Sequence, residues 1–445
     1  MIDCSGISTA SQLQKYFDKY GAETYQFSKN QKIAVDTRMN INGAYNLKGF
    51  SAYADMPIFK LNPRVSEKDF GIQEAIITIN GAGPSIEGIR FDGNDVNQLF
   101  ERGDGYHNFI KLYKTTGFRA DRLYVENSLG DGIRAQFADD TEISRMGVHQ
   151  CGHDGIYLQE SKNVIVSGCV FHIRTNCATR FRACENAQFY NNWVENQIHT
   201  GISTGPGLQL ENSTTSTTAK DYSIFNNYFK NTDGPGIWAI NTYAVSPDAA
   251  TGLNIYQNTF ENCGQGGHYK NVTSTGGICI DGWKAGIYQN LFTGCSSGVT
   301  IGPWVSITPA GSGYQVTVKN NMFAHCAAGK QVYSSAGTGI DKTSKVNTKV
   351  SCSENWFYEN KNDYFGTGET TQINPYLTLN NHLYVIGDKS SVEGRGIGAK
   401  DVNNTYESTD VEKVEIRISK ILKVRYSDKY PNVLPEGVII WKRKS

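Results

Sequence analysis

The chain lacks a net charge. Lys and Arg together number 43, as do Asp and Glu, so no overall field favours binding to nucleic acid or to an anionic membrane. Nor is any apolar run long enough to cross a bilayer, so we expect no membrane insertion. Residues 1–12 lack the apolar core of a signal peptide, so either the protein stays inside the cell or this is a mature segment with an added Met.

The ten cysteines include no Cys-x-x-Cys pair, and the eight histidines are scattered, a pattern that disfavours a metal centre. Several cysteines instead recur three residues after an apolar residue, as in Phe260-x-x-Cys263 and Phe292-x-x-Cys295. Stacked coils would set such residues about 4.8 Å apart with parallel side chains, whereas a disulfide needs Cβ atoms about 3.8 Å apart. We therefore expect a buried ladder of free thiols.

The most prominent feature of the sequence is an internal repeat. Four stretches of 23 residues align without gaps between residues 121 and 212. One column of this alignment holds Val125, Val148, Phe171 and Val194, and a second holds Gly132, Gly155, Ala178 and Gly201. A fixed period of this length is typical of a solenoid, in which each repeat buries its apolar side only against its neighbours.

The period then lengthens to between 31 and 35 residues, while an Asn-x-apolar motif persists. Its asparagines are predicted to form a buried amide ladder: Asn192, Asn227, Asn258, Asn290, Asn321 and Asn355. The extra residues of each coil would form loops that wall a binding face, and they fall in residues 203–207, 213–220, 243–252, 264–275 and 303–313.

Three regions follow from these patterns. Residues 1–75 are expected to form an N-terminal cap with the first strands, including a helix over residues 5–21 that Ser and Thr cap and Gly21 ends. Residues 76–405 would form the solenoid. Residues 406–445, with a charged run and a basic end, form a tail or second cap to which we assign no role.

Each coil reads as Gly-apolar-x-apolar, a polar turn, apolar-x-apolar, then Asn-x-Phe. Over residues 75–400 this resembles the right-handed parallel β-helix of the pectate-lyase-like superfamily, which includes polysaccharide lyases, polygalacturonase-type hydrolases, epimerases and phage tailspikes. The resemblance implies an all-β, single-stranded, right-handed parallel β-helix of about 10–12 coils with an N-terminal capping helix. The Asn-rich coils look closest to archaeal disaggregatases. Both the polygalacturonase motifs and the Asp-Pro-His signature of alginate epimerases are missing.

In relatives of this fold the groove follows the sheet whose strands here begin at the Gly132 column. Because side chains alternate along a strand, pairs such as Ile133/Ala135 point inward and their neighbours face outward. The outward residues are Lys111, Tyr113, Arg134, Gln136, Tyr157, Gln159, Arg180, Arg182, Gln209, Glu211, Trp238 and Asp281. The clustered arginines suit a ligand with carboxylates, although salt bridges to Asp139, Asp140 or Glu185 are an alternative. Trp238, Trp283 and Trp304 could stack on sugars, and Trp283 could equally pack under a loop.

Asp131 and Asp154 share a column and would stack one coil apart, where each raises the proton affinity of the other. Such a pair suits glycoside hydrolysis, with His153 as a proton shuttle. The simpler interpretation is that each Asp caps a turn.

The competing chemistry is β-elimination on a uronate. Arg180 or Arg182 would neutralise the carboxylate, and Tyr157, Lys111 or His153 would remove the proton. Calcium assists such lyases in this fold, but the acidic residues do not cluster on one coil. We therefore expect no cofactor, while leaving calcium possible.

These features predict an endo-acting depolymerase that cleaves an acidic, uronate-containing extracellular or cell-surface polysaccharide, with hydrolysis slightly preferred. A lyase that acts by β-elimination is the first alternative. A glycan-binding surface module without activity, an epimerase and a tailspike-like trimer are the others. The sequence does not indicate an oligomeric state.

Overall fold

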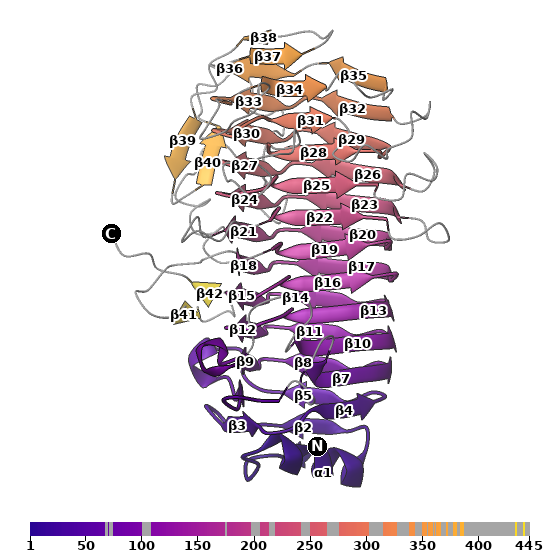
Figure 1. Ribbon diagram of the computed structural model, residues 1–445, viewed down its shortest axis with the longest axis vertical. Coiled ribbons are helices and arrows are strands. Elements are labelled where there is room, and N and C mark those ends of the chain that lie inside the picture. Colours follow the sequence, from indigo (N-terminus) through magenta and orange to yellow (C-terminus); the bar gives the residue numbers. More distant parts are fainter. Residues whose placement is uncertain are drawn as a thin grey trace. The chain divides into compact units, whose positions relative to one another are not determined.

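The computed structural model of the chain describes residues 1–66, 70, 74–99, 108–173, 176–196, 205–212, 219–241, 250–264, 276–301, 315–326, 338–342, 349–353, 355–358, 360, 362–365, 371–372, 377–380, 383–386, 432–433 and 439–440. The chain divides into two compact units. Unit 1 is Met1–Arg180 with Lys420–Ser445, and unit 2 is Phe181–Ser419. Each unit is built from short parallel strands stacked rung upon rung (Figure 1).

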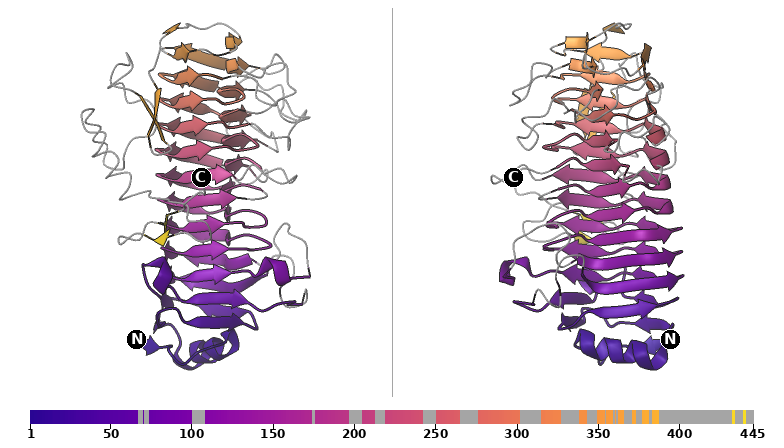
Figure 2. Two further views of the ribbon diagram at one scale, coloured as in Figure 1. Left: turned by 90° about the vertical axis from the view of Figure 1, so that its left-hand side faces the viewer. Right: turned by 45° about the vertical axis from the view of Figure 1, so that its right-hand side comes forward.

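The N-terminal end of unit 1 is covered by helix α1 (Ala10–Tyr20) (Figure 2). Thr9 and Gln12 form a reciprocal capping box at its start, and the N–H of Gly21 donates to the carbonyl of Phe17 at its end. Leu13 and Phe17 are buried on its inner side. The predicted capping helix is therefore confirmed, since it begins and ends at the residues that its capping signals indicate.

Unit 1 contains three parallel sheets. Sheet A pairs β1 (Ile2–Asp3), β2 (Thr24–Gln26), β5 (Asn46–Lys48), β8 (Ser85–Glu87), β11 (Arg119–Asp121), β14 (Glu142–Ser144) and β17 (Lys162–Ser167). Sheet B pairs β3 (Lys32–Val35), β6 (Ile58–Leu61), β9 (Arg90–Asp92), β12 (Tyr124–Glu126), β15 (Gly147–His149) and β18 (Val170–Ile173). Sheet C pairs β4 (Met39–Asn42), β7 (Ala75–Ala82), β10 (Asn108–Thr116), β13 (Ile133–Asp139) and β16 (Ile156–Gln159). Two 3₁₀ turns, η1 (Tyr53–Asp55) and η2 (Asp95–Asn97), complete this part.

Unit 2 repeats the three-sheet pattern, and β19 (Thr179–Arg182) lies at the division between the units. Its sheet A holds β20 (Glu185–Tyr190), β23 (Ala219–Phe225), β26 (Ala250–Tyr256), β29 (Ala285–Tyr288), β32 (Gln315–Lys319) and β35 (Lys349–Ser353). Its sheet B holds β21 (Trp193–Asn196), β24 (Tyr228–Lys230), β27 (Thr259–Glu261), β30 (Leu291–Thr293), β33 (Met322–Ala324), β36 (Trp356–Tyr358) and β38 (Thr371–Gln372). Its sheet C holds β22 (Leu208–Glu211), β25 (Ile237–Ile240), β28 (Ile278–Asp281), β31 (Val299–Ile301), β34 (Thr338–Lys342) and β37 (Asn362–Phe365).

The register of unit 1 follows the 23-residue period. Lys111 pairs with Arg134 and Arg134 with Tyr157, each 23 residues further along the chain. Ile133, Ala135, Ile156 and Leu158 are buried inside the coil, as their alternation predicts. The fold is therefore an all-β, right-handed parallel β-helix, which confirms the predicted fold class.

The amide ladder is confirmed in unit 2. Five steps join its six asparagines, and in each step the side-chain Nδ2 donates to the Oδ1 of the next asparagine at 2.9–3.1 Å. Phenylalanines stack beside them with ring centroids 4.8–5.2 Å apart, at Phe229, Phe260, Phe292, Phe323 and Phe357. All ten cysteines are free thiols and nine are buried, as the proposed thiol ladder requires.

Two short antiparallel pairs lie among the later residues, β39 (Leu377–Asn380) with β40 (Leu383–Ile386) and β41 (Asn432–Val433) with β42 (Ile439–Ile440). Most of the tail at residues 406–445, most of the predicted loops, Gly201 and Trp304 lie outside the described residues. The division at residues 75 and 405 stays a prediction. Among the described helices, none is long and apolar enough to cross a membrane.

Candidate functional site

The turn that enters sheet C in unit 1 carries a column of side chains that cap one another. Asn108 accepts from the N–H of Asp131 (2.7 Å), Asp131 from that of Asp154 (2.9 Å), and Asp154 from that of Cys177 (3.3 Å). A glycine follows each aspartate because the coils touch here: a Cβ on Gly155 would lie 2.6 Å from the Ala178 carbonyl oxygen. The turn-capping interpretation of the two aspartates is therefore confirmed.

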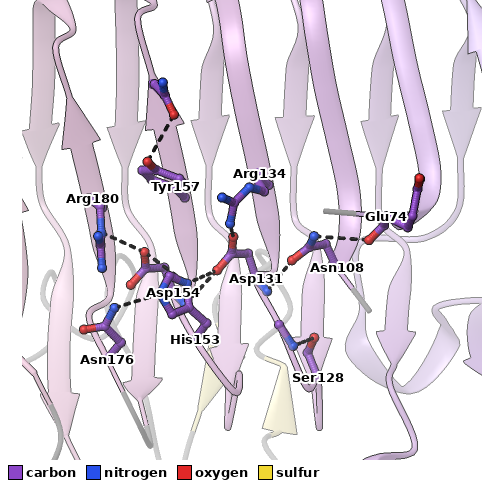
Figure 3. Close-up of polar contacts among 12 residues, drawn as sticks. Glu74, Asn108, Ser128, Asp131, Arg134, His153, Asp154, Tyr157, Asn176 and Arg180 are labelled. Carbon is purple, nitrogen blue, oxygen red and sulfur yellow. Dashed lines mark hydrogen bonds and ion pairs between the residues drawn. The ribbon is translucent and has the colours of Figure 1, made fainter. Parts of the chain in front are cut away.

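Asp131 has further partners besides this turn. It is fully buried. Its Oδ1 lies 2.6 Å from Nδ1 of His153, and its Oδ2 accepts from Nη1 of Arg134 at 2.8 Å (Figure 3). Burial alone would raise the pKa of Asp131, but the hydrogen bond and charge of His153, together with Arg134 and the Asp154 N–H, outweigh burial and lower the pKa below its usual value. Asp131 is therefore a carboxylate.

Asp154 is equally buried and sits between a thiol and a guanidinium. The Cys177 Sγ donates to its Oδ1 at 2.9 Å, and Nε of Arg180 lies 2.9 Å from its Oδ2. The Arg180 N–H is not aligned with that oxygen, so the contact is an ion pair rather than a hydrogen bond. Burial and the Asp154 charge raise the pKa of Cys177 well above its usual value, which keeps it a thiol.

His153 joins the two aspartates. Its Nδ1 lies 2.6 Å from Asp131 and 3.4 Å from Asp154, and its Nε2 lies 3.1 Å from Nδ2 of Asn176. Burial would lower the pKa of His153, but the charge of Asp154 and the hydrogen bond and charge of Asp131 together raise it to about 9. The ring nitrogens thus contact protein groups rather than open solvent, although 14% of the side chain is exposed.

Together these groups form a row of alternating charge, here called the charge row: Arg134, Asp131, His153, Asp154 and Arg180 (Figure 3). Alternation offsets the cost of burying the two carboxylates. With His153 protonated the row holds three cations and two anions, and its net charge is one positive. Loss of the His153 proton makes the row neutral.

Tyr157 lies over the two ends of the charge row. The guanidinium carbon of Arg134 is 4.7 Å from its ring centroid and that of Arg180 is 5.3 Å away. Its hydroxyl donates to Oε1 of Gln159 at 3.1 Å. Arginines near an aromatic ring make cation–π contacts, so both guanidiniums hold the Tyr157 ring in place.

The structure brings most of the predicted residues of unit 1 together. Lys111 and Tyr113 lie one rung from Arg134 and Gln136 on sheet C, and Gln159 shares β16 with Tyr157. Tyr113 is 37% exposed, whereas Tyr157, two rungs further on, is 4% exposed and the side chains of Arg134 and Arg180 are 15% and 16% exposed. The alternative partners proposed for the arginines were wrong for Arg134 and Arg180, since their acids are Asp131 and Asp154 rather than Asp139, Asp140 or Glu185.

The predicted residues of unit 2 form a separate group. Nε of Arg182 lies 3.7 Å from Oε2 of Glu211, and Gln209 donates to the same carboxylate. The prediction that the outward residues face solvent was wrong for Trp238 and Asp281, which are 5% and 1% exposed, and Trp238 packs in an apolar cluster with Ile240 and Cys279. It was also wrong for Tyr157, Gln209 and Glu211, which are 4%, 5% and 8% exposed. Trp283 is fully buried beside Tyr222 and offers no surface to a sugar.

The structure bears on the expected acid–base role of the Asp131/Asp154 pair. One member is expected to hold its proton, but the pKa of Asp131 is lowered, because the hydrogen bond and charge of His153 and the charge of Arg134 outweigh the effect of burial. Both carboxylates are also fully buried. A glycosidase acid must reach the glycosidic oxygen, so the acid–base role of the pair stays a prediction that its burial disfavours.

Asp131, His153 and Asp154 are also the group best placed to hold a metal ion, since their ligand atoms lie within 4.8 Å of one another. Their geometry fits a metal poorly. The 2.6 Å contact between His153 and Asp131 is a hydrogen-bond distance and leaves no space for an ion bound to both. Arg134 and Arg180 already neutralise the remaining oxygens.

Sequence reasoning missed Asn108, Asn176 and Cys177. The 23-residue period could have found them, because Asn108 and Cys177 share the column of the two aspartates and Asn176 shares that of His153. An amide or thiol between charged residues gives no signal of its own chemistry, so only the register marks it.

Two family models match the chain. Residues 74–247 match a model described as right handed beta helix region, and residues 219–413 match one described as disaggregatase related. With the observed fold, the first match confirms the predicted resemblance to right-handed parallel β-helix proteins. The second match agrees with the narrower resemblance to disaggregatases. No curated protein sequence matches the chain.

Solved structures share the fold at low identity. The A-module of the mannuronan C-5 epimerase AlgE6 from Azotobacter vinelandii is 11% identical, with a TM-score of 0.57 over 83% of this chain and 98% of that one. The PL6 family alginate lyase AlyGC is 12% identical, with a TM-score of 0.48 over 97% of this chain and 59% of that one. An exopolygalacturonase from Thermotoga maritima is 11% identical, with a TM-score of 0.44 over 71% and 84%. At these identities the likeness establishes the fold.

Proposed function

We propose that the protein is an endo-acting depolymerase of an acidic, uronate-containing extracellular or cell-surface polysaccharide, and that it cleaves by β-elimination. The fold shared with the A-module of a mannuronan C-5 epimerase supports the substrate class. Fold alone does not choose the reaction. The choice rests on the side chains on the outer side of sheet C.

One observation carries the proposal: Tyr157 lies between two guanidiniums, and a buried aspartate holds each of them in place. Elimination from a uronate needs positive charge beside the substrate carboxylate, a base for the C5 proton and an acid for the leaving oxygen. Arg134 and Arg180 provide the charge, since a forked guanidinium can pair with a carboxylate. Tyr157 provides the proton-transfer group.

The steps balance with Tyr157 alone. Its ionised oxygen takes the C5 proton, the C5–H electrons form the C4–C5 double bond, and the C4–O4 bond breaks. The phenol then gives its proton to the departing O4. Asp131, His153 and Asp154 keep the two arginines in position, a supporting role that suits groups buried in the turn.

This proposal replaces the slight preference for hydrolysis. Hydrolysis would need two carboxyl groups on either side of the bond to be cleaved, whereas Asp131 and Asp154 are buried together within the turn. Elimination uses Arg134, Tyr157 and Arg180, which lie on the outer side of sheet C. No calcium enters these steps.

The test is the product formed from a panel of uronate-containing polymers. Elimination leaves an unsaturated uronate with a new ultraviolet absorbance, whereas hydrolysis leaves reducing ends without it. We expect Tyr157→Phe to lower the rate about 10²- to 10⁴-fold, the usual value of a proton-transfer group. Tyr190→Phe is the matched control, because Tyr190 stacks on Phe225 in sheet A of unit 2, and it should keep full activity.

A glycan-binding module without activity is the second candidate. The observation in its favour is that the column from Asn108 to Cys177 already caps its turns, which needs no catalysis. Binding of the polymers without chain shortening would support it. Reducing ends without ultraviolet absorbance would overturn elimination, and full activity of Tyr157→Phe would overturn the role of Tyr157.

A further inference from the structure

The outer nitrogen of His153, Nε2, lies 3.1 Å from Nδ2 of the Asn176 carboxamide. The inner nitrogen faces Asp131 and Asp154, and Arg134 and Arg180 stand beyond these carboxylates. Asn176 therefore contacts the Nε2 edge of the ring, while the two aspartates contact Nδ1.

His153 can exist in two forms, and each needs a different partner at Nε2. The neutral ring, with its proton on Nδ1 toward Asp131, has a lone pair on Nε2 that accepts from an N–H. The imidazolium has an Nε2–H that needs an acceptor. A carboxamide has both groups, since its NH₂ donates and its oxygen accepts, and a half-turn about its last bond exchanges them.

We propose that Asn176 is a positioning residue for His153. The carboxamide of Asn176 rotates by a half-turn about its last bond, so that the His153 ring stays hydrogen-bonded in both protonation states. Its catalytic consequence rests on the proposed function. A ring bonded at both nitrogens can gain or lose a proton without moving, so the charge row changes its net charge while Arg134 and Arg180 stay in place.

The charge state of the row then sets affinity for an anionic chain. With the imidazolium, the row is positive and attracts uronates. Without its proton the row is neutral, and attraction weakens. Asn176 shifts the pH at which this happens because it stabilises the charged ring through its oxygen.

The test is a titration of the imidazole nitrogens by NMR with histidine-selective labelling, on the whole chain and without substrate. We expect the His153 midpoint near pH 9 in the natural protein. Asn176→Leu, which keeps the side-chain shape but has no acceptor, should lower it by about one to two units. Asn176→Asp, which only accepts, should raise it.

Asn163→Leu is the matched control, because Asn163 donates to Asp140 in the turn before sheet A of unit 1, and it should leave the midpoint unchanged. An unchanged midpoint in both Asn176 variants would overturn the proposal, as would equal shifts in the control. If Leu at this position prevented folding, the Asp variant alone would decide. The expected shifts without any unsaturated product would overturn the proposed function and leave the role of Asn176 standing.

Discussion

Burial determines what each titratable residue of unit 1 can do. Asp131 and Asp154 are fully buried and pair with Arg134 and Arg180, so both carboxyl groups anchor these arginines. His172 is also buried and His149 is half-buried, and desolvation lowers the pKa of both, that of His149 to about 4. One residue type thus takes opposite roles in the same unit, because His153 has carboxylate partners and these two have each other.

Because their pKa values are lowered, His149 and His172 should make the protein less stable in acid. In the unfolded chain a histidine takes its proton near pH 6.5, whereas folded His149 takes it only near pH 4. Between these values the unfolded state binds more protons, so acid favours unfolding. The free energy of unfolding should fall by about 3 kcal/mol from this residue alone, measured by denaturant unfolding at pH 7 and pH 4.

Replacement of His149 by Gln should flatten this pH dependence, whatever it does to stability at pH 7. His325 is exposed, and His325→Gln should leave the slope as it is. A slope that stays the same in His149→Gln would show that this histidine titrates normally.

For single residues, the sequence could predict the rung on which a residue lies better than the residue with which its side chain interacts. The period places Arg134, Tyr157 and Arg180 on neighbouring rungs, and the structure agrees. It could not predict that Arg134 turns back to Asp131 three residues earlier. A side chain chooses its partner by rotamer and local burial, and neither follows from column spacing.

The asparagine column is the element that joins the coils of unit 2. Asn258 accepts from both the N–H and the side chain of Asn227, and its Nδ2 donates to Asn290 and to the carbonyl of Ile224. All of these groups are buried. A single asparagine therefore satisfies polar groups on three successive coils.

Asn258→Ala should lower the free energy of unfolding by about 3 kcal/mol or more, because several buried donors and acceptors would lose their hydrogen-bond partner, at a cost of about 1–3 kcal/mol each. The control is Asn254→Ala, in an exposed position of β26, the strand that precedes Asn258, which should change stability by no more than about 0.5 kcal/mol. Denaturant unfolding measures both. Similar losses in the two variants would show that the ladder is not the source of stability.

The strands of the regular coils could be predicted from alternation, since Ile133 and Leu158 are inside and Arg134 is on the outer side. The same rule failed for Trp238, which lies at an outward position of β25 but is buried. Alternation tells on which side of a strand a residue lies. It does not tell whether that side is covered, because cover comes from residues far away in sequence.

For the whole molecule, the proposed endo action predicts how a polymer is shortened. A solenoid sheet continues from rung to rung and has no closed end that selects a chain terminus. The viscosity of a uronate polymer should therefore fall early, while few double bonds have formed. Viscometry and ultraviolet absorbance followed together test this. Absorbance that rises in step with small products, at constant viscosity, would indicate cleavage from the chain end.

The turn column that begins at Asn108 constrains how such a protein can change in length. Each side chain caps the next coil, so its partner is set by counting 23 residues and not by any local motif. A single inserted residue here would shift Asp154 away from the Asp131 side chain and separate the arginines together with it. Gain or loss of a complete coil elsewhere would keep the count. This part of the chain can therefore be lengthened only in whole coils.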